Sequence, residues 1–129
     1  MEKIDGNPRL KIPWLNPSLL FKNIKTLGEL HFQIINIKAP DDFIGLKEKI
    51  RNIFEKIDFM DPCKMDFAYE ILGQLPDNDN VNHGDFHPGN ILYHDDTPYV
   101  IDWGFVTKAD QLADLANTYV KFKKIPRDP

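Results

Sequence analysis

The sequence predicts a mainly α-helical domain that carries one small β-hairpin. Three stretches before residue 75 and a fourth after residue 110 repeat apolar residues at helical spacing. Between them, two short β-prone runs flank a turn-forming segment, which is typical of a hairpin. With 129 residues and 42% hydrophobic content, the chain is long enough for one domain with its own core.

The first helix is expected to begin at Asn16-Pro17 and to end near Ile37. Asparagine caps helices well, and proline fits the first helical position because its missing N–H would have no partner there. One face of this segment carries residues at helical spacing, namely Leu20, Ile24, Leu27, His31 and Ile34. This spacing predicts an amphipathic helix.

Two shorter helices are expected next. The second is capped by Asp41 or Asp42 and has one apolar face, formed by Phe43, Leu46, Ile50, Ile53 and Ile57. The third opens at Asp61-Pro62 and stops at Gly73, a residue type that commonly follows a helix. Its inward side chains are expected to be Met65, Ala68 and Leu72.

The pattern changes after the polar segment 76–80. The runs 91–93 and 99–101 predict two strands, and the polar residues 94–98 between them predict the turn of a hairpin. A last helix is expected from about Asp110 to Phe122. Its inward face is expected at Leu112, Leu115, Ala116 and Tyr119.

The composition narrows the class of protein. The 16 basic and 20 acidic residues give a net charge of −4, which argues against nucleic acid as the main partner because phosphates need a basic surface. Cys63 is the single cysteine, so an internal disulfide is excluded. No apolar run is long enough for a membrane span, and residues 1–6 do not start a signal peptide. A soluble, cytoplasmic protein without a membrane partner is expected.

The segment His83-Gly84-Asp85-Phe86-His87-Pro88-Gly89-Asn90 is the most informative part of the sequence. An aspartate followed at the fifth position by asparagine has the spacing of a protein-kinase catalytic loop. There a carboxylate lies beside the attacking hydroxyl, and an amide oxygen reaches a metal ion on the phosphates. Asp102 ends the second strand, so the hairpin can return it to Asn90 for a shared Mg²⁺ site.

Together with Ile101-Asp102-Trp103 and Asp114-Leu115-Ala116, this segment resembles the aminoglycoside phosphotransferase and choline kinase-like family. The resemblance implies the C-terminal lobe of a protein-kinase-like α+β fold, with ATP and Mg²⁺ as cofactors. It implies catalytic roles for Asp85, as the base, and for His83, which supports the loop. Asn90 and Asp102 match the metal ligands that hold the nucleotide's phosphates, and Asp114 matches a residue that braces the site.

The first residues resemble the hinge of that family. Residues 1–6, with Glu2 and Ile4, would then meet the adenine through their backbone. No segment for an N-terminal lobe precedes Met1, so a fragment is expected that starts at the hinge. A longer chain would supply that lobe, or the exposed lobe face would self-associate. The acceptor would be an aminoglycoside, choline, a sugar or a similar small molecule.

Other interpretations use the same residues. Aspartate, asparagine and glycine also form ordinary polar loops, and His87 is expected to brace the loop rather than to react. His83, Asp85 and His87, with His94 not far away, could hold Zn²⁺ in a metal-dependent hydrolase. A third alternative is a catalytically inactive remnant that binds nucleotide. On this interpretation the chain alone transfers no phosphate at a useful rate.

Overall fold

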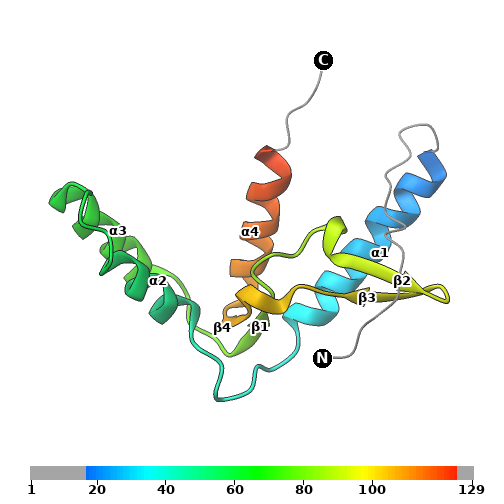
Figure 1. The fold of residues 1–129 in the computed structure, drawn as a ribbon, viewed down its shortest axis with the longest axis horizontal. Helices are drawn as coiled ribbons and strands as arrows, with labels where there is room; N and C mark the ends of the chain where they lie inside the picture. Colours follow the sequence, from blue (N-terminus) through cyan, green and yellow to red (C-terminus); the bar gives the residue numbers. More distant parts are fainter. Residues whose placement is uncertain (1–16, 125–129) are drawn as a thin grey trace.

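The computed structural model describes residues 17–124, in which helices and two small antiparallel sheets alternate (Figure 1). The helices are α1 (Pro17–Ile35), α2 (Leu46–Phe54), α3 (Pro62–Gln74) and α4 (Gln111–Lys124). One sheet pairs β1 (Asn80–Asn82) with β4 (Thr107–Ala109), and the other pairs β2 (Ile91–His94) with β3 (Thr97–Val100). The four predicted helices and the hairpin are therefore found, and the β1–β4 pair is an addition that the sequence did not predict.

The starts of α2 and α3 show which capping predictions were correct. Asp61 caps α3 as expected, because its side chain accepts a hydrogen bond of 3.3 Å from the Lys64 amide. The prediction of Asp41 or Asp42 as the cap of α2 is wrong. These residues form a turn, and Gly45 precedes the helix with an extended backbone. The cause is tertiary, since the Lys108 amide of β4 donates to the Ile44 carbonyl at 3.0 Å and keeps this segment extended.

The hairpin fixes where two of the candidate residues lie. Its register pairs Ile91 with Val100, and its two turn residues, Asp95 and Asp96, have φ values of 46° and 62°. Two consecutive positive φ values match the tight turn whose twist suits a two-residue hairpin. Short 3₁₀ turns precede and follow the hairpin at Pro88–Asn90 and Trp103–Phe105.

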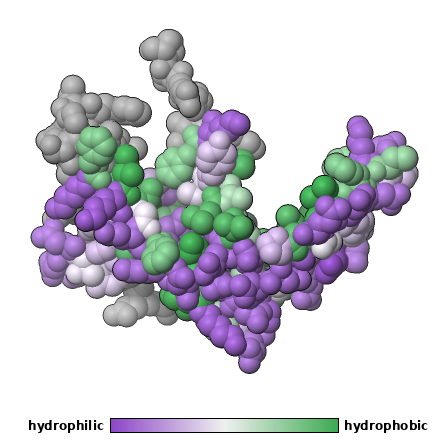
Figure 2. Space-filling model, turned by 180° about the vertical axis from the view of Figure 1, so that it is seen from behind, coloured by the Kyte–Doolittle hydropathy of each residue, from purple (hydrophilic) through white to green (hydrophobic). Residues whose placement is uncertain are grey.

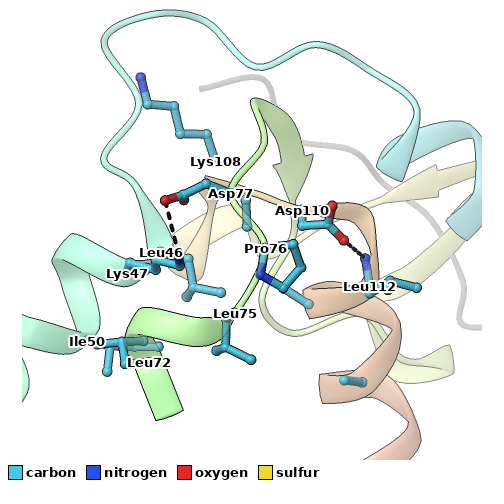
Figure 3. A pocket seen from close by; sticks show the side chains of 13 residues that line it. Leu46, Lys47, Ile50, Leu72, Leu75, Pro76, Asp77, Lys108, Asp110 and Leu112 are labelled. Carbon is cyan, nitrogen blue, oxygen red and sulfur yellow. Dashed lines mark hydrogen bonds and ion pairs between the residues drawn. The ribbon is translucent and has the colours of Figure 1, made fainter. Parts of the chain in front are cut away.

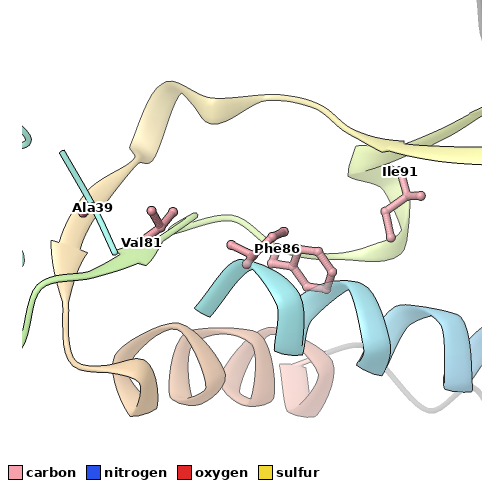
Figure 4. Close-up of a cluster of buried hydrophobic side chains, with 5 residues drawn as sticks. Ala39, Val81, Phe86 and Ile91 are labelled. Carbon is pink, nitrogen blue, oxygen red and sulfur yellow. The ribbon is translucent and has the colours of Figure 1, made fainter. Parts of the chain in front are cut away.

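The core lies beneath the segment that joins β1 to β2. Its buried apolar side chains come from α1 and the chain just after it, from β1, from this segment and from the start of β2, namely Ile34, Ala39, Val81, Phe86 and Ile91 (Figure 4). His31 of α1 is buried too, as expected, and its ring stacks on Phe86 with a centroid distance of 4.2 Å. Burial of Phe86 therefore anchors the middle of the segment 83–90.

The predicted inward face of α4 is wrong. Leu112 and Tyr119 are 64% and 65% exposed, whereas Asp114 and Thr118 of the same helix are buried. The reason is that α4 packs with its polar side on β1 and on the segment after it, whose backbone groups need hydrogen-bond partners. The apolar side of the helix is left facing outward.

The α2–α3 pair projects from this body as an arm (Figure 1). Figure 2 shows apolar side chains in the middle of one face and along this arm. Between the arm and α4 lies an apolar cavity of about 380 Å³, lined by residues such as Leu46, Ile50, Leu72 and Ala113 (Figure 3). At its rim Lys47 pairs with Asp77 at 3.1 Å. Among the described residues, no helix has the length and hydropathy to cross a membrane.

Candidate functional site

The site is built on residues 83–90, which leave the end of β1 and enter β2. Gly84 makes the first bend with a φ of +76°, a value that glycine adopts without strain. A Cβ at this position would lie 2.7 Å from the Phe105 carbonyl oxygen, so the backbone of the 3₁₀ turn after the hairpin crosses directly over it. This close approach explains why glycine stands between His83 and Asp85.

Asp114 is the main brace of this segment. It is 0% exposed, and its carboxylate accepts hydrogen bonds from the His83 amide at 3.1 Å and from the Gly84 amide at 2.9 Å. The His31 ring adds a third contact, with its Nε2 3.1 Å from the carboxylate. Burial would raise the pKa of Asp114, but these hydrogen bonds outweigh it and hold the pKa below its ordinary value. The carboxylate is thus fixed in the ionised form and acts as a structural anchor.

His83 is locked in place and neutral. It is 0% exposed, its Nδ1 accepts from the Asp85 amide at 3.2 Å, and its Nε2 lies 3.0 Å from the Ile101 carbonyl oxygen. This pair of partners requires the proton on Nε2. Burial lowers the pKa of His83 against the opposing effect of the bond to Ile101. This burial and these two bonds agree with the supporting position that the family resemblance implies for His83. Its role is to tie the loop to the strand end before Asp102.

Asp85 presents its carboxylate to solvent. Its side chain is 21% exposed, and Lys121 of α4 forms an ion pair with one of its oxygens. The other oxygen accepts from the Asn90 amide nitrogen at 3.2 Å and lies 3.7 Å from the His87 ring. Partial burial lowers the pKa of Lys121. The carboxylate is therefore held by neighbours on both sides while one face stays open, as a group that must meet a substrate requires.

Asn90 and Asp102 lie at neighbouring positions at the base of the hairpin. The Ile101 amide donates to the Asn90 carbonyl oxygen at 2.9 Å, so the residue after Ile101 starts beside Asn90. Because the amide nitrogen of Asn90 donates to Asp85, its amide oxygen is the atom that remains for a cation. Asp102 is exposed and has a φ of 64°, a conformation that is uncommon for aspartate and is often found at functional sites. That the amide oxygen of Asn90 and a carboxylate oxygen of Asp102 lie close enough to share one cation stays a prediction.

Three further residues of α4 hold the loop, and sequence reasoning missed them. Asn117 donates to the Gly84 carbonyl, Thr118 donates to the Phe86 carbonyl at 3.1 Å, and Lys121 meets Asp85. With Asp114 they form a polar stripe at positions i, i+3, i+4 and i+7, which share one face of a helix. That spacing was the available signal in the sequence.

The histidines of the loop have other partners than a metal. His83 uses both ring nitrogens within the protein, and Nδ1 of His87 accepts from the Gly89 amide at 3.0 Å. Within residues 17–124, no three or more His, Cys, Asp or Glu side chains are placed to hold a metal ion. Because both ring nitrogens of His83 are bonded within the protein, the alternative zinc site loses this ligand. The hinge residues Glu2 and Ile4 lie outside the described part of the chain.

A carboxylate open to solvent, an amide five residues later and an aspartate after a hairpin keep the order and spacing that the sequence shares with a kinase catalytic loop. In agreement with this, residues 1–128 match the phosphotransferase enzyme family, and the chain belongs to that family. A human protein, acyl-CoA dehydrogenase family member 11, is 29% identical over 137 aligned residues, which cover 91% of this chain. The chain spans 18% of that relative's length. No solved structure matches the present chain.

Proposed function

We propose that the protein transfers a phosphoryl group from ATP, with Mg²⁺, to a hydroxyl group of a small molecule. Membership of the phosphotransferase family supports the reaction class. The observation that carries the proposal is the state of Asp85, an accessible carboxylate in a loop whose backbone is anchored by Asp114, Asn117 and Thr118. A base that is held rigidly at the surface can meet an acceptor hydroxyl without paying for reorganisation.

In this proposal the residues of the loop and of α4 have distinct roles. Asp85 orients the acceptor hydroxyl and accepts its proton. Lys121 and the Asn90 amide keep the carboxylate from turning away. His83 fixes the distance between the loop and the strand end, through its bond to the Ile101 carbonyl. Mg-ATP, when bound, supplies the phosphoryl group and the charge that neutralises it during transfer.

The donor set fits Mg²⁺. Asn90 offers an amide oxygen and Asp102 offers an exposed carboxylate, and both are the hard oxygen ligands that this ion prefers. Two protein ligands suffice where phosphate oxygens and water complete the octahedron, as in kinase sites. The left-handed backbone of Asp102 is a cost that the fold carries at this one position of the site.

The test uses purified protein, Mg-ATP and a panel of hydroxyl compounds, with ADP release as the readout. Asp85→Asn is expected to lower the turnover rate by at least about 100-fold, because it removes the proton acceptor and keeps the side chain's shape. Asp110→Asn is the matched control, since Asp110 caps α4 away from the loop. Asp102→Asn is expected to weaken Mg²⁺-dependent nucleotide binding, measured by calorimetry. Failure of the protein both to bind Mg-ATP and to release ADP would overturn the proposal.

The second candidate is a nucleotide-binding protein without turnover. The observation that favours it is the ion pair of Lys121 with Asp85, which occupies one oxygen of the base. The same two measurements separate the candidates. Mg-ATP binding without ADP release on any acceptor would support the second, and release that is lost in Asp85→Asn would support the first.

A further inference from the structure

Lys121 differs from the other polar residues on its side of α4. Asp114, Asn117 and Thr118 bind backbone groups of the loop, whereas Lys121 contacts the carboxylate of Asp85. Its side chain is 37% exposed, so the ion pair is within reach of a solute. The fold does not need this contact to satisfy a buried group, because both side chains are partly hydrated. A role at the site explains it better than a role in stability.

The side chains that contact Asp85 are basic or neutral, and Asp102, the other exposed carboxylate of the site, is the proposed Mg²⁺ ligand. His87 lies 3.7 Å from the second carboxylate oxygen, and the Asn90 amide donates to that oxygen. The nearest buried acid, Asp114, has its charge satisfied by two amides and His31. The single negative charge of Asp85 is therefore offset by its own neighbours before any acceptor arrives.

A cavity beside the loop is lined by a lysine, so its charge has the same sign as that of Lys121. It has a volume of about 250 Å³ and is lined by Gly84 and Asn117, which flank the site, and by apolar side chains of α2 and α4. Among the described residues that line it, the one charged side chain is Lys49, whose ammonium lies 3.4 Å from the Phe105 carbonyl oxygen and 5.6 Å from the Phe105 ring centroid. These described lining residues include no carboxylate. A cationic group placed here would face lysine and find no counter-charge.

We propose that Lys121 positions Asp85 and, with Lys49, selects a neutral or anionic hydroxyl compound with an apolar part as the acceptor. The inference rests on the proposed phosphoryl transfer and specifies its substrate class. Among the acceptors that the family resemblance allowed, a polycation such as an aminoglycoside, or choline, is disfavoured by like-charge contact. Lys121 is a positioning residue in this scheme, because it acts on the hydroxyl through Asp85.

The experiment compares three acceptors with one carbon skeleton: hydroxyhexanoate, hexanediol and aminohexanol. Their binding is measured by calorimetry with Mg²⁺ and a non-hydrolysable ATP analogue, and their turnover by ADP release. In the unchanged protein the anionic compound is expected to bind at least about tenfold more tightly than the cationic one. Lys121→Met is expected to collapse this ratio, Lys121→Glu to reverse it, and Lys121→Arg to retain it. Lys123→Met, an exposed residue of the same helix, is the matched control.

The readouts separate this inference from the proposed function. Selective binding of the anionic compound without ADP release would refute phosphoryl transfer and keep the charge selection. ADP release with a ratio that Lys121→Met leaves unchanged would refute the role of Lys121 and keep phosphoryl transfer. A purely structural lysine would weaken all three compounds equally on replacement. Equal or tighter binding of the cationic compound, or no binding of any of the three, would overturn the inference.

Discussion

Replacing Asp114 by asparagine removes the charge that holds the loop 83–90 and changes little else in shape. The carboxylate accepts three hydrogen bonds, at 3.1, 3.1 and 2.9 Å. Asparagine keeps one acceptor oxygen, so at least one of these donors would face an NH₂ group. Losing one charge-assisted hydrogen bond costs about 2 kcal/mol, and making the other two neutral costs about 1 kcal/mol each. The expected loss in the free energy of unfolding is therefore about 4 kcal/mol, a large share of a domain's total stability.

The assay is urea denaturation followed by circular dichroism, with Asp110→Asn as the reference. Asp110 lies just before α4 and accepts from the Leu112 amide at 2.9 Å, and asparagine caps a helix equally well, so this change should stay within about 0.5 kcal/mol. If Asp114→Asn cost no more than this reference, the carboxylate would not be the anchor that its contacts indicate.

The pH dependence gives a second check on Asp114. Its pKa in the folded protein is lowered, so its contribution to stability is full above the ordinary value of 3.8 and is lost as the pH falls below that value. Protonated Asp114 resembles the asparagine variant. The stability gap between the two proteins should therefore narrow on acidification below pH 3.8. A constant gap through this range would refute the ionised state assigned to the buried carboxylate.

Three more perturbations follow from the geometry. Gly84→Ala is expected to lower the free energy of unfolding by at least about 2 kcal/mol, because the φ of Gly84 is +76° and a Cβ would lie 2.7 Å from a carbonyl oxygen. Gly28→Ala in α1 is the comparison: its Cβ meets nothing within 4 Å, so it should raise the free energy of unfolding by about 1 kcal/mol in the same urea assay. Asp102→Gly is expected to preserve or raise the melting temperature, because glycine adopts a φ of 64° without strain. The same change is expected to abolish Mg²⁺-dependent nucleotide binding in calorimetry. A lower melting temperature would contradict the backbone strain inferred at Asp102. Self-association is expected through the exposed apolar side of α4, where Leu112 and Tyr119 are 64% and 65% exposed. Leu112→Glu and Tyr119→Glu are expected to reduce this association in sedimentation, and unchanged association would place the contact elsewhere.

Local signals in the sequence were enough to predict most of the helices and the hairpin. Asp61-Pro62 is a complete start signal for a helix, and α3 begins there with the expected bond from the cap. The hairpin was predictable because two β-prone runs flank a polar turn. The spacing of Asp85 and Asn90 predicted the loop, and the side-chain bond between these two residues agrees with it.

Long-range contacts decided what the sequence could not. Strands β1 and β4 are too short and polar to be recognised by alternation, and their pairing joins residues far apart in the chain, such as Val81 and Lys108. For α4, apolar and polar residues both recur at helical spacing, and the apolar set was taken as the inward face. Only the needs of the loop backbone, which Asn117 and Thr118 satisfy, decide the orientation.

The loop depends on partners that follow it in the chain. A ribosome delivers residues 83–90 before it delivers Asp114, Asn117 and Lys121, while α1 with His31 is already complete. Domains form as their segments emerge during synthesis, so the nascent chain passes through a stage with α1, α2 and α3 made and the loop 83–90 unsupported. The amides of His83 and Gly84 find their acceptor only when α4 folds back. The geometry of the loop 83–90 is thus reached only after α4 has been synthesised and has folded back.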